Sequence, residues 1–271
     1  MTRGSLTIVG TGIQIAYHLT QGSELSIRTA EKVLFLVSDP ISELTIRKLN
    51  NTAESLSDCY EKGIHHRFFA YECMIEKILY FLRKGLNVCV VFYGHPGVFV
   101  YPSHEVLRIA KSEGFFVKMM PAISAEDCLF ADLGIDPARN GCHSFEATDF
   151  LIHKRKFDPS SNLILWQIGV IGEMGFDKNN KYSRKGLKIL INFLLNYYNH
   201  DHTTVVYEAS ISTLGNPYIN CVTLGNLEST KITVMSTLYI PPKKSEPDPE
   251  MLIRLNLKSS DFHGNRSCWQ S

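Results

Sequence analysis

Short apolar runs alternate with longer segments of helical periodicity in the first half of the chain. The runs are rich in Val, Ile and Phe, and they have the length of strands that are buried on both faces. Residues 71–82 and 103–113 place apolar side chains three to four positions apart, which predicts two crossover helices. This alternation is typical of a parallel α/β sheet. The apolar runs are residues 6–9, 33–37, 88–93 and 115–119.

The pattern changes after residues 134–141, which gather Gly, Asp, Pro and Asn and suit a domain boundary. One strong helix is predicted at 185–198, among several strands, so the second half resembles a mixed sheet. The strands are expected at residues 163–168, 203–207, 218–222 and 232–240. We therefore expect a parallel α/β domain at 1–136, a mixed-sheet α/β domain at 137–242, and an extended polar tail at 243–271 with a short helical piece near 251–257.

The composition excludes several classes of partner. The chain has 271 residues, 44% of them hydrophobic, so a substantial core is possible. Lys and Arg number 28 against 27 Asp and Glu, which leaves no strong field to gather nucleic acid or anionic lipid. The apolar runs are far shorter than the ~20 residues that cross a bilayer. We expect a cytoplasmic protein with neither a nucleic-acid nor a membrane partner.

The cysteines indicate neither a disulfide framework nor a zinc site. They number seven, an odd count, and no CxxC pair occurs among them. We expect reduced and mostly buried thiols. His95 also lacks a second ligand at metal-binding spacing, so no metal is expected. The cysteines are Cys59, Cys73, Cys89, Cys128, Cys142, Cys221 and Cys268.

Three motifs follow predicted strands, where α/β sheets bind ligands. Residues 10–12, Gly-Thr-Gly, lack the third glycine of a dinucleotide fingerprint, and a tight turn explains them equally well. Residues 93–99, Tyr-Gly-His-Pro-Gly-Val-Phe, form a rigid loop in which His95 is expected to hydrogen-bond. Ser124 begins the next predicted helix, and Asp127 three residues later suits a capping box.

Taken together, the Gly-Thr-Gly turn, the Tyr-Gly-His-Pro-Gly loop and the Pro-Ala-Ile-Ser-Ala helix start resemble the tetrapyrrole-methylase-like (class III) superfamily of S-adenosylmethionine (SAM) methyltransferases. Within it the chain is similar to borosin-type peptide backbone N-methyltransferases, particularly the bacterial form whose substrate peptide is a separate chain. The match runs from about residue 4 to residue 242 and includes 165–169, 206–209 and 236–238. It implies a two-domain α/β fold with SAM in the interdomain cleft.

The resemblance also implies the residues that contact SAM and its product S-adenosylhomocysteine (SAH). The residue types agree, because hydroxyl and backbone groups suit the amino-acid end and apolar side chains suit adenine. Glu146 and Glu208 lie near strand ends and receive no role. The first domain would contribute Gly12, Tyr93, His95, Val98, Phe99, Ser124 and Ala125, and the second Gln167, Tyr207, Ser236 and Thr237.

Tyr60, Arg67 and Tyr71 are the candidate catalytic residues. Arg67 and Tyr71 are four positions apart and share one face if their segment is helical. The residues alone favour a solvated Arg beside an interfacial Tyr, whereas the resemblance implies that they act on the substrate amide. Arg67 would stabilise an imidate through the amide oxygen, and a tyrosine would accept the amide proton.

Three functions are weighed. The resemblance implies N-methylation of a separate precursor peptide by a homodimer whose subunits complete one another's sites. The chain ends about 30 residues after Pro241, so we expect the substrate in trans, the alternative being methylation of the tail at 261–271. Methylation of a small molecule such as a tetrapyrrole would leave Tyr60, Arg67 and Tyr71 without a purpose. A non-catalytic module would bind SAM or peptide without turnover.

Overall fold

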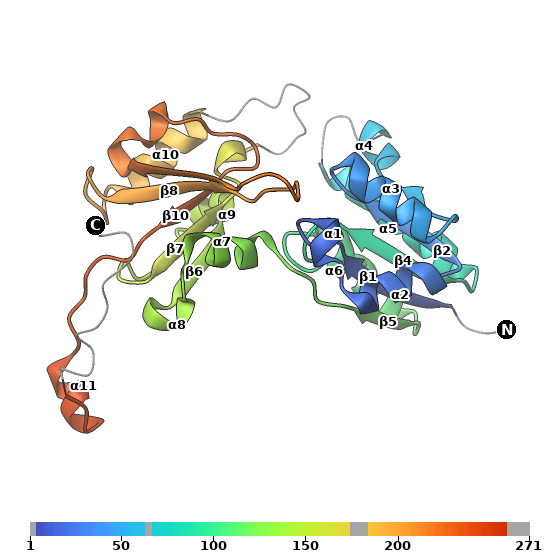
Figure 1. Cartoon of the computed structure of the whole chain (residues 1–271), viewed down its shortest axis with the longest axis horizontal. Helices are drawn as coiled ribbons and strands as arrows, with labels where there is room; N and C mark the ends of the chain where they lie inside the picture. The colour runs from blue at the N-terminus through green and yellow to red at the C-terminus, as the bar shows by residue number, and fades with distance from the viewer. Residues whose placement is uncertain (1–3, 63–66, 174–183, 259–271) are drawn as a thin grey trace. The chain divides into compact units, whose positions relative to one another are not determined.

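The computed structural model describes residues 4–62, 67–173 and 184–258. The chain divides into two compact units. The first is built from the chain up to Leu129 and also takes in Ala209–Tyr218. The second holds Phe130–Gly172 and the described residues of Lys181–Glu208 and Ile219–Ser271. The division falls inside helix α7 (Ala125–Leu133), shortly before the turn-rich segment that suggested a boundary. Each unit contains a five-stranded sheet (Figure 1).

The sheet of the first unit is parallel, as the sequence predicts, with the strand order β3-β2-β4-β1-β5. The four predicted strands are confirmed. The two-residue edge strand β3 was not expected, because Glu54 and Ser55 are polar and form no apolar run. The strands are β1 (Ser5–Gly10), β2 (Lys32–Leu36), β3 (Glu54–Ser55), β4 (Asn87–Phe92) and β5 (Phe116–Met119).

Both predicted crossover helices are present: α5 leads into β4, and α6 connects β4 with β5. Helices α2 and α3 lie in the stretches between the apolar runs, where helices were expected without stated bounds, and both begin with a side-chain cap. Thr20 accepts a hydrogen bond from the Ser23 amide, and Asp39 accepts one from the Ser42 amide. The helices of this unit before α7 are α1 (Ile15–His18), α2 (Gln21–Thr29), α3 (Pro40–Leu49), α4 (Asp58–Lys62), α5 (Arg67–Arg83) and α6 (Tyr101–Ser112).

Alternate residues of the central strand β4 pack into two separate cores. Val88, Val90 and Phe92 pack with the buried side chains of α5, whereas Cys89 and Val91 pack with those of α2 and α3. All five side chains are at most 2% exposed. Because helices cover both faces of the sheet, this strand is apolar at almost every position and shows no alternation in the sequence.

The second unit has a mixed sheet, as expected, with the strand order β6-β7-β10-β8-β9. Strand β6 runs parallel to β7, whereas β10 runs antiparallel to both β7 and β8. The edge strand β6 was not predicted, because the sequence Cys-His-Ser-Phe-Glu has no apolar run. The strands are β6 (Cys142–Glu146), β7 (Asn162–Trp166), β8 (Thr203–Glu208), β9 (Tyr218–Thr223) and β10 (Thr237–Ile240).

Two strands of this unit are shorter than predicted. Strand β7 ends at Trp166 and not at residue 168, because Gln167 has a left-handed backbone with φ of 60°. Strand β10 begins at Thr237 and not at residue 232. The Ser236 hydroxyl accepts a hydrogen bond from the Thr233 amide at 2.8 Å and closes a turn there.

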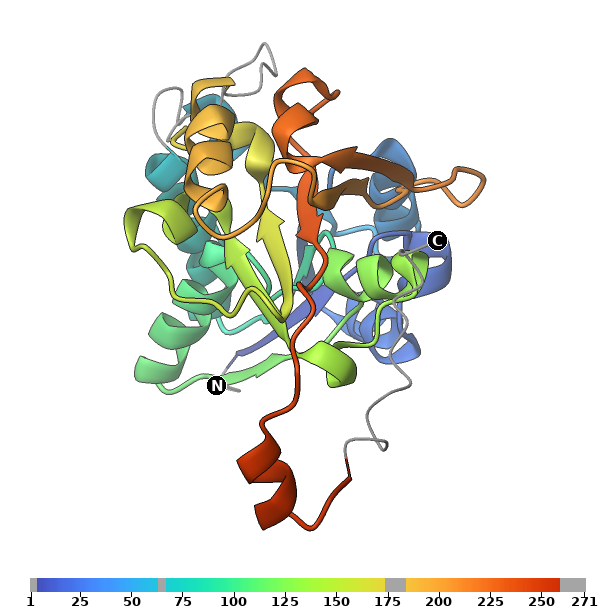
Figure 2. The same ribbon diagram turned by 90° about the vertical axis from the view of Figure 1, so that its left-hand side faces the viewer.

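The predicted helix at 185–198 is α10 (Arg184–Leu194), which ends four residues earlier than expected. The amides of Asn196 and Tyr197 bond to carbonyls three residues back, a spacing that tightens and ends an α-helix. The short tail helix is confirmed as α11 (Pro249–Arg254), which an extended segment joins to β10 (Figure 2). The remaining helices are α8 (Pro137–Asn140), α9 (Ala147–Ile152), and the 3-10 helices η1 (Ile168–Val170) and η2 (Leu224–Ser229).

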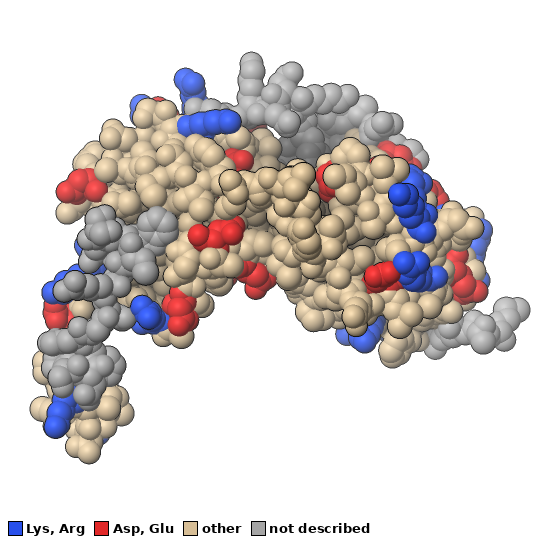
Figure 3. Space-filling view, viewed as in Figure 1, with Lys and Arg blue, Asp and Glu red and all other residues tan. Residues whose placement is uncertain are grey.

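Charged side chains of both signs are scattered over the face seen in Figure 3, and neither sign forms a continuous patch there. This agrees with the nearly balanced composition of 28 basic and 27 acidic residues. Within the described ranges, no helix combines the length and the apolar character that crossing a membrane requires.

The prediction of reduced thiols is wrong for one pair, because Cys59 and Cys73 form a disulfide between α4 and α5. Their Cα atoms are 5.6 Å apart. The sequence gives no sign of this pairing, because a separation of 14 residues matches no disulfide or metal motif. Of the other described cysteines, Cys89 is buried and Cys221 is exposed. Cys268 lies outside the described residues.

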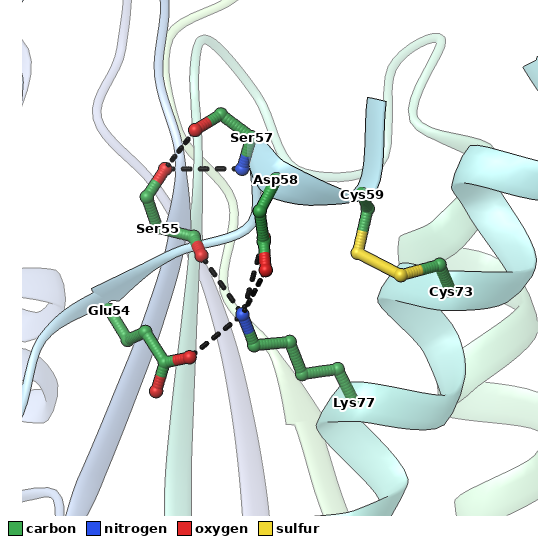
Figure 4. Close-up of a disulfide and its surroundings, with 7 residues drawn as sticks. All are labelled: Glu54, Ser55, Ser57, Asp58, Cys59, Cys73 and Lys77. Carbon is green, nitrogen blue, oxygen red and sulfur yellow. Dashed lines mark hydrogen bonds and ion pairs between the residues drawn. A yellow bond between two sulfur atoms is a disulfide. The ribbon is translucent and has the colours of Figure 1, made fainter. Parts of the chain in front are cut away.

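Lys77 forms ion pairs that connect α5 with α4 and with strand β3. Lys77 of α5 places its ammonium 2.8 Å from a Glu54 oxygen and 3.1 Å from an Asp58 oxygen (Figure 4). It also donates a hydrogen bond to the Ser55 carbonyl at 3.2 Å. Hydrogen bonds from Lys32 and Lys77 lower the pKa of Glu54, which keeps this carboxylate charged. The disulfide and the lysine together hold α4 against α5.

Replacing Cys73 by Ser, or reducing the wild-type protein, is expected to lower the free energy of unfolding by about 3 kcal/mol. This is the chain-entropy value for a closed loop of this size. Urea unfolding with and without dithiothreitol measures it. Cys221→Ser is the matched control, because this exposed thiol lies outside the disulfide, and a change within about 0.5 kcal/mol is expected. If the urea midpoint of the wild-type protein is the same with and without dithiothreitol, the prediction is wrong.

Candidate functional site

The loops at the carboxyl ends of β1 and β4 touch through their backbones. The Gly94 amide donates to the Gly12 carbonyl at 3.0 Å, and the Gly12 amide donates to the Gly94 carbonyl at 3.2 Å. A Cβ on Gly10 would lie 2.1 Å from the Gly94 oxygen and 2.8 Å from Ala122 Cβ. Glycine at position 10 is therefore required for the close approach of three strand-end loops. The tight-turn interpretation of residues 10–12 is confirmed.

Two side chains of the β4 loop have defined surroundings. His95 accepts a hydrogen bond from the Gly97 amide through Nδ1 at 3.0 Å, as expected for a histidine in a rigid loop. Burial raises the pKa of Tyr93 to about 12. Tyr93 therefore stays protonated at neutral pH and does not suit the role of a proton acceptor. It remains available as a neutral packing or hydrogen-bonding group.

The same loop holds two apolar side chains in solvent. Val98 is 39% exposed and Phe99 is 52% exposed. Phe99 also has a left-handed backbone with φ of 56°, a conformation that costs energy for a residue with a side chain. An aromatic ring held outside the core in this way is suited to stacking on a flat ring such as adenine.

Ser124 forms the predicted capping box at the start of α7. Its amide and its hydroxyl both donate to Asp127 Oδ2, at 2.7 and 2.6 Å, and its hydroxyl accepts from the Asp127 amide at 3.3 Å. The Ser124 side chain is 8% exposed. The capping role is therefore confirmed, and the cap fixes the backbone that leads to Ala125.

The candidate catalytic residues lie on α4 and α5. Tyr60 and Tyr71 are both half-buried and pack against the same apolar cluster between α5 and the sheet. Arg67 is the first residue of α5, one turn before Tyr71, so the helical spacing is confirmed. The Arg67 side chain lies outside the described residues. Around Tyr71 stand two further aromatic rings, Phe68 at 6.4 Å and Tyr101 at 5.8 Å between ring centroids.

In the second unit, three of the four predicted cofactor side chains are buried. Tyr207, Ser236 and Thr237 are at most 4% exposed. The Tyr207 hydroxyl donates to an Asp132 carboxylate oxygen at 2.7 Å, and the Ser236 hydroxyl donates to Glu208 at 2.6 Å. Sequence reasoning missed both carboxylates as partners. The one sequence signal for such a partner was a position near a strand end, which Glu208 has and Asp132 lacks.

Gln167 is half-buried at the end of β7 with its left-handed backbone. Four described non-glycine residues have a positive φ, and two of them, Phe99 and Gln167, are predicted to contact SAM. Strained backbone of this kind gathers at ligand sites. The hydroxyls, the Gln167 amide and the exposed Phe99 ring are groups that suit the polar and the aromatic parts of SAM. No three His, Cys, Asp or Glu side chains among the described residues gather to hold a metal ion.

Gln167→Gly is expected to unfold with a free energy about 1 kcal/mol higher than Gln167→Ala, since only glycine relieves the left-handed strain. Both variants lack the amide side chain, so their difference isolates the backbone. Chemical denaturation of the two proteins measures it. Equal stabilities, or a more stable alanine variant, would mean that this backbone is not strained in solution.

Comparison with known proteins gives concordant results. A family model described as "Tetrapyrrole (Corrin/Porphyrin) Methylases" matches residues 5–213. The chain is 43% identical over 263 residues to a Gymnopus fusipes protein named as a methyltransferase and gymnopeptide precursor, covering 95% of this chain and 62% of that protein. It is 42% identical over 270 residues to a Coprinopsis marcescibilis methyltransferase and type I borosin cyclic peptide precursor, covering 95% and 68%.

The fold is similar to that of uroporphyrin-III-C-methyltransferase from Thermus thermophilus, with a TM-score of 0.61 at 15% sequence identity over 89% of this chain and 93% of that one. At this identity the likeness concerns the fold alone. The chain spans about three fifths of the length of its Gymnopus fusipes relative. Because the family model covers most of the chain, this protein belongs to the tetrapyrrole methylase family, and its relatives include methyltransferase proteins that are also borosin precursors.

Proposed function

We propose that this chain transfers the methyl group of SAM to backbone amide nitrogens of a peptide. One observation carries the proposal. Arg67 and Tyr71 lie one turn apart on α5, beside the α4 helix that carries Tyr60. The relatives named as methyltransferases and cyclic peptide precursors supply the kind of substrate. Tetrapyrrole methylase family membership supports SAM as the methyl donor.

The chemistry requires an activated amide. An amide nitrogen is a poor nucleophile because its lone pair is delocalised into the carbonyl. A guanidinium at Arg67 hydrogen-bonds the amide oxygen and stabilises the negative charge that gathers there. Tyr71, in its phenolate form, accepts the N–H proton and becomes a neutral phenol, with Tyr60 as the alternative acceptor. The nitrogen then forms a bond to the methyl carbon as the carbon–sulfur bond breaks, so that SAH leaves.

Bound SAM supplies the electrophilic methyl group. In the first unit, Val98 and Phe99 offer exposed apolar surface, Gly12 and Ser124 lie in the loops at the strand ends, and Ala125 begins α7. Tyr93 and His95 belong to the same loops. In the second unit, Gln167, Tyr207, Ser236 and Thr237 lie at the ends of β7, β8 and β10.

The proposal further includes a homodimer, which the resemblance to borosin methyltransferases implies, and a cytoplasmic enzyme. Methylation of a small molecule such as a tetrapyrrole is the second candidate, and the family name favours it. That substrate gives no reason for Tyr60, Arg67 and Tyr71. A protein that binds SAH and never methylates a peptide or a tetrapyrrole would be a binding module.

Tyr71→Phe and Arg67→Ala are each expected to lower the methylation rate of a precursor peptide by ~10² to 10⁴, because each removes a group that acts as charge develops on the amide. The affinity for SAM should stay within a few-fold. Mass spectrometry of the peptide over time measures the rate, and melting temperatures check the fold.

Tyr80→Phe is the matched control for the loss of a hydroxyl. Tyr80 lies on the same helix, is 53% exposed, and has the Lys84 ammonium 4.1 Å from its ring centroid. This variant should methylate at the wild-type rate. If Tyr71→Phe and Arg67→Ala do so as well, the amide-activation mechanism is wrong and the small-molecule candidate gains support.

The peptide is proposed to be a separate chain, as in the bacterial form that the sequence resembles. The relatives above favour the alternative, because their names unite methyltransferase and precursor in one protein. Intact-mass analysis after incubation with SAM and a candidate precursor peptide separates the two. Methyl increments are expected on the added peptide. Increments on the enzyme chain itself, including its residues 259–271 outside the described ranges, would contradict a separate substrate.

A further inference from the structure

The strand ends of the second unit are joined by one carboxylate. Glu208 is the last residue of β8 and is half-buried. Its Oε1 atom accepts two hydrogen bonds, from the Thr233 hydroxyl at 2.6 Å and from the Ser236 hydroxyl at 2.6 Å. Both hydroxyls belong to the turn that precedes β10. Hydrogen bonds to a charged acceptor are short and strong, so this contact fixes the turn to the end of β8.

The two hydroxyls also accept backbone hydrogen bonds. The Ser236 oxygen accepts from the Thr233 amide at 2.8 Å, and the Thr233 oxygen accepts from the Met235 amide at 3.1 Å. A hydroxyl has one proton, and here each proton goes to Glu208, which leaves the lone pairs for the amides. The Glu208 oxygen takes both hydroxyl protons and the backbone amides can only donate, so every bond in this network has one direction.

The turn at residues 233–236 also contacts the backbone at the end of β7. The Ile168 amide donates to the Ser236 carbonyl at 3.2 Å. A Cβ on Gly169 would lie 2.0 Å from the backbone carbonyl oxygen of Thr233. The two backbones are therefore in direct contact, and position 169 requires glycine. A displacement of the 233–236 turn would therefore move the backbone next to Gln167.

We propose that Glu208 is a positioning residue of the SAM site, which sets the geometry of three strand ends through Thr233 and Ser236. The inference rests on the proposed function, because the residues that it positions are the proposed SAM contacts Gln167, Ser236 and Thr237. Glu208 acts through these residues. This role requires a side-chain oxygen at position 208 that accepts the two hydroxyl hydrogen bonds. Its loss is expected to weaken the binding of the cofactor.

The experiment is calorimetry of SAH binding to the full chain. Glu208→Leu removes the acceptor and leaves two hydroxyls unpaired, so the Kd for SAH should rise roughly tenfold to hundredfold, the scale of losing a charge-assisted hydrogen bond. Glu208→Gln keeps a carbonyl oxygen and should stay within about threefold of wild type. In turnover assays, Glu208→Leu should raise the KM for SAM more than it lowers kcat.

Glu146→Leu is the matched control for a purely structural loss. Glu146 is also a half-buried strand-end glutamate of this unit, and its carboxylate caps α9 by accepting from the Asp149 amide at 2.7 Å. Its loss should lower the melting temperature and leave the Kd for SAH unchanged. If Glu208→Leu does not fold, Thr233→Val takes its place, since it removes one of the two donors without touching a proposed SAM contact and should weaken SAH binding several-fold.

The outcomes separate the inference from the proposed function. A wild-type chain that fails to bind SAH at millimolar concentration rejects the SAM site itself. A wild-type chain that binds SAH, with Glu208→Leu or Thr233→Val binding equally well, rejects the role of Glu208 alone. If Glu208→Leu and Glu146→Leu weaken SAH binding equally, Glu208 contributes only to the stability of the fold. If Glu208→Gln binds SAH as weakly as Glu208→Leu, the positioning role is also wrong.

Discussion

The parallel pairing of β1 with β4 is the constraint on which the first unit depends. Its register places Gly10 opposite Phe92, so the chain leaves both strands at the same level of the sheet. The two loops that follow then meet as backbones, with Gly12 and Gly94 bonded in both directions. A shift of one residue would turn every side chain of β4 into the opposite core and separate the loops. The exposed aromatic loop and the capped start of α7 both rest on this register.

Much of this unit follows from the sequence because a strand buried on two faces has a strong signature. Residues 88–93 are apolar throughout, as is typical of a strand in a parallel sheet covered by helices on both faces. The cap at Ser124 was predictable for a similar reason, since Asp127 stands at the spacing that a capping box requires. Local chemistry of this kind depends on neighbours within four residues, which the sequence displays directly.

The features that escaped prediction depend on distant partners. Tyr207 reaches Asp132 across 75 positions, and Ser236 reaches Glu208 across 28. The disulfide joins cysteines on two helices whose packing had first to be known. The left-handed backbone at Gln167, which shortens β7, has no sequence signal because glutamine has no preference for it. Arg67 and Tyr71 were recognised through family resemblance, since their spacing alone fits an ordinary helix.

The two units hold their strand-end loops by different physical means. In the first unit the β1 and β4 loops are fixed to each other by backbone hydrogen bonds and by the absence of a side chain at Gly10. In the second unit the turn at 233–236 is fixed by side-chain hydroxyls and one carboxylate. Truncating a polar side chain there removes the support itself. Substitutions in the first unit therefore change mainly what a ligand touches, whereas polar substitutions in the second change where its contacts lie.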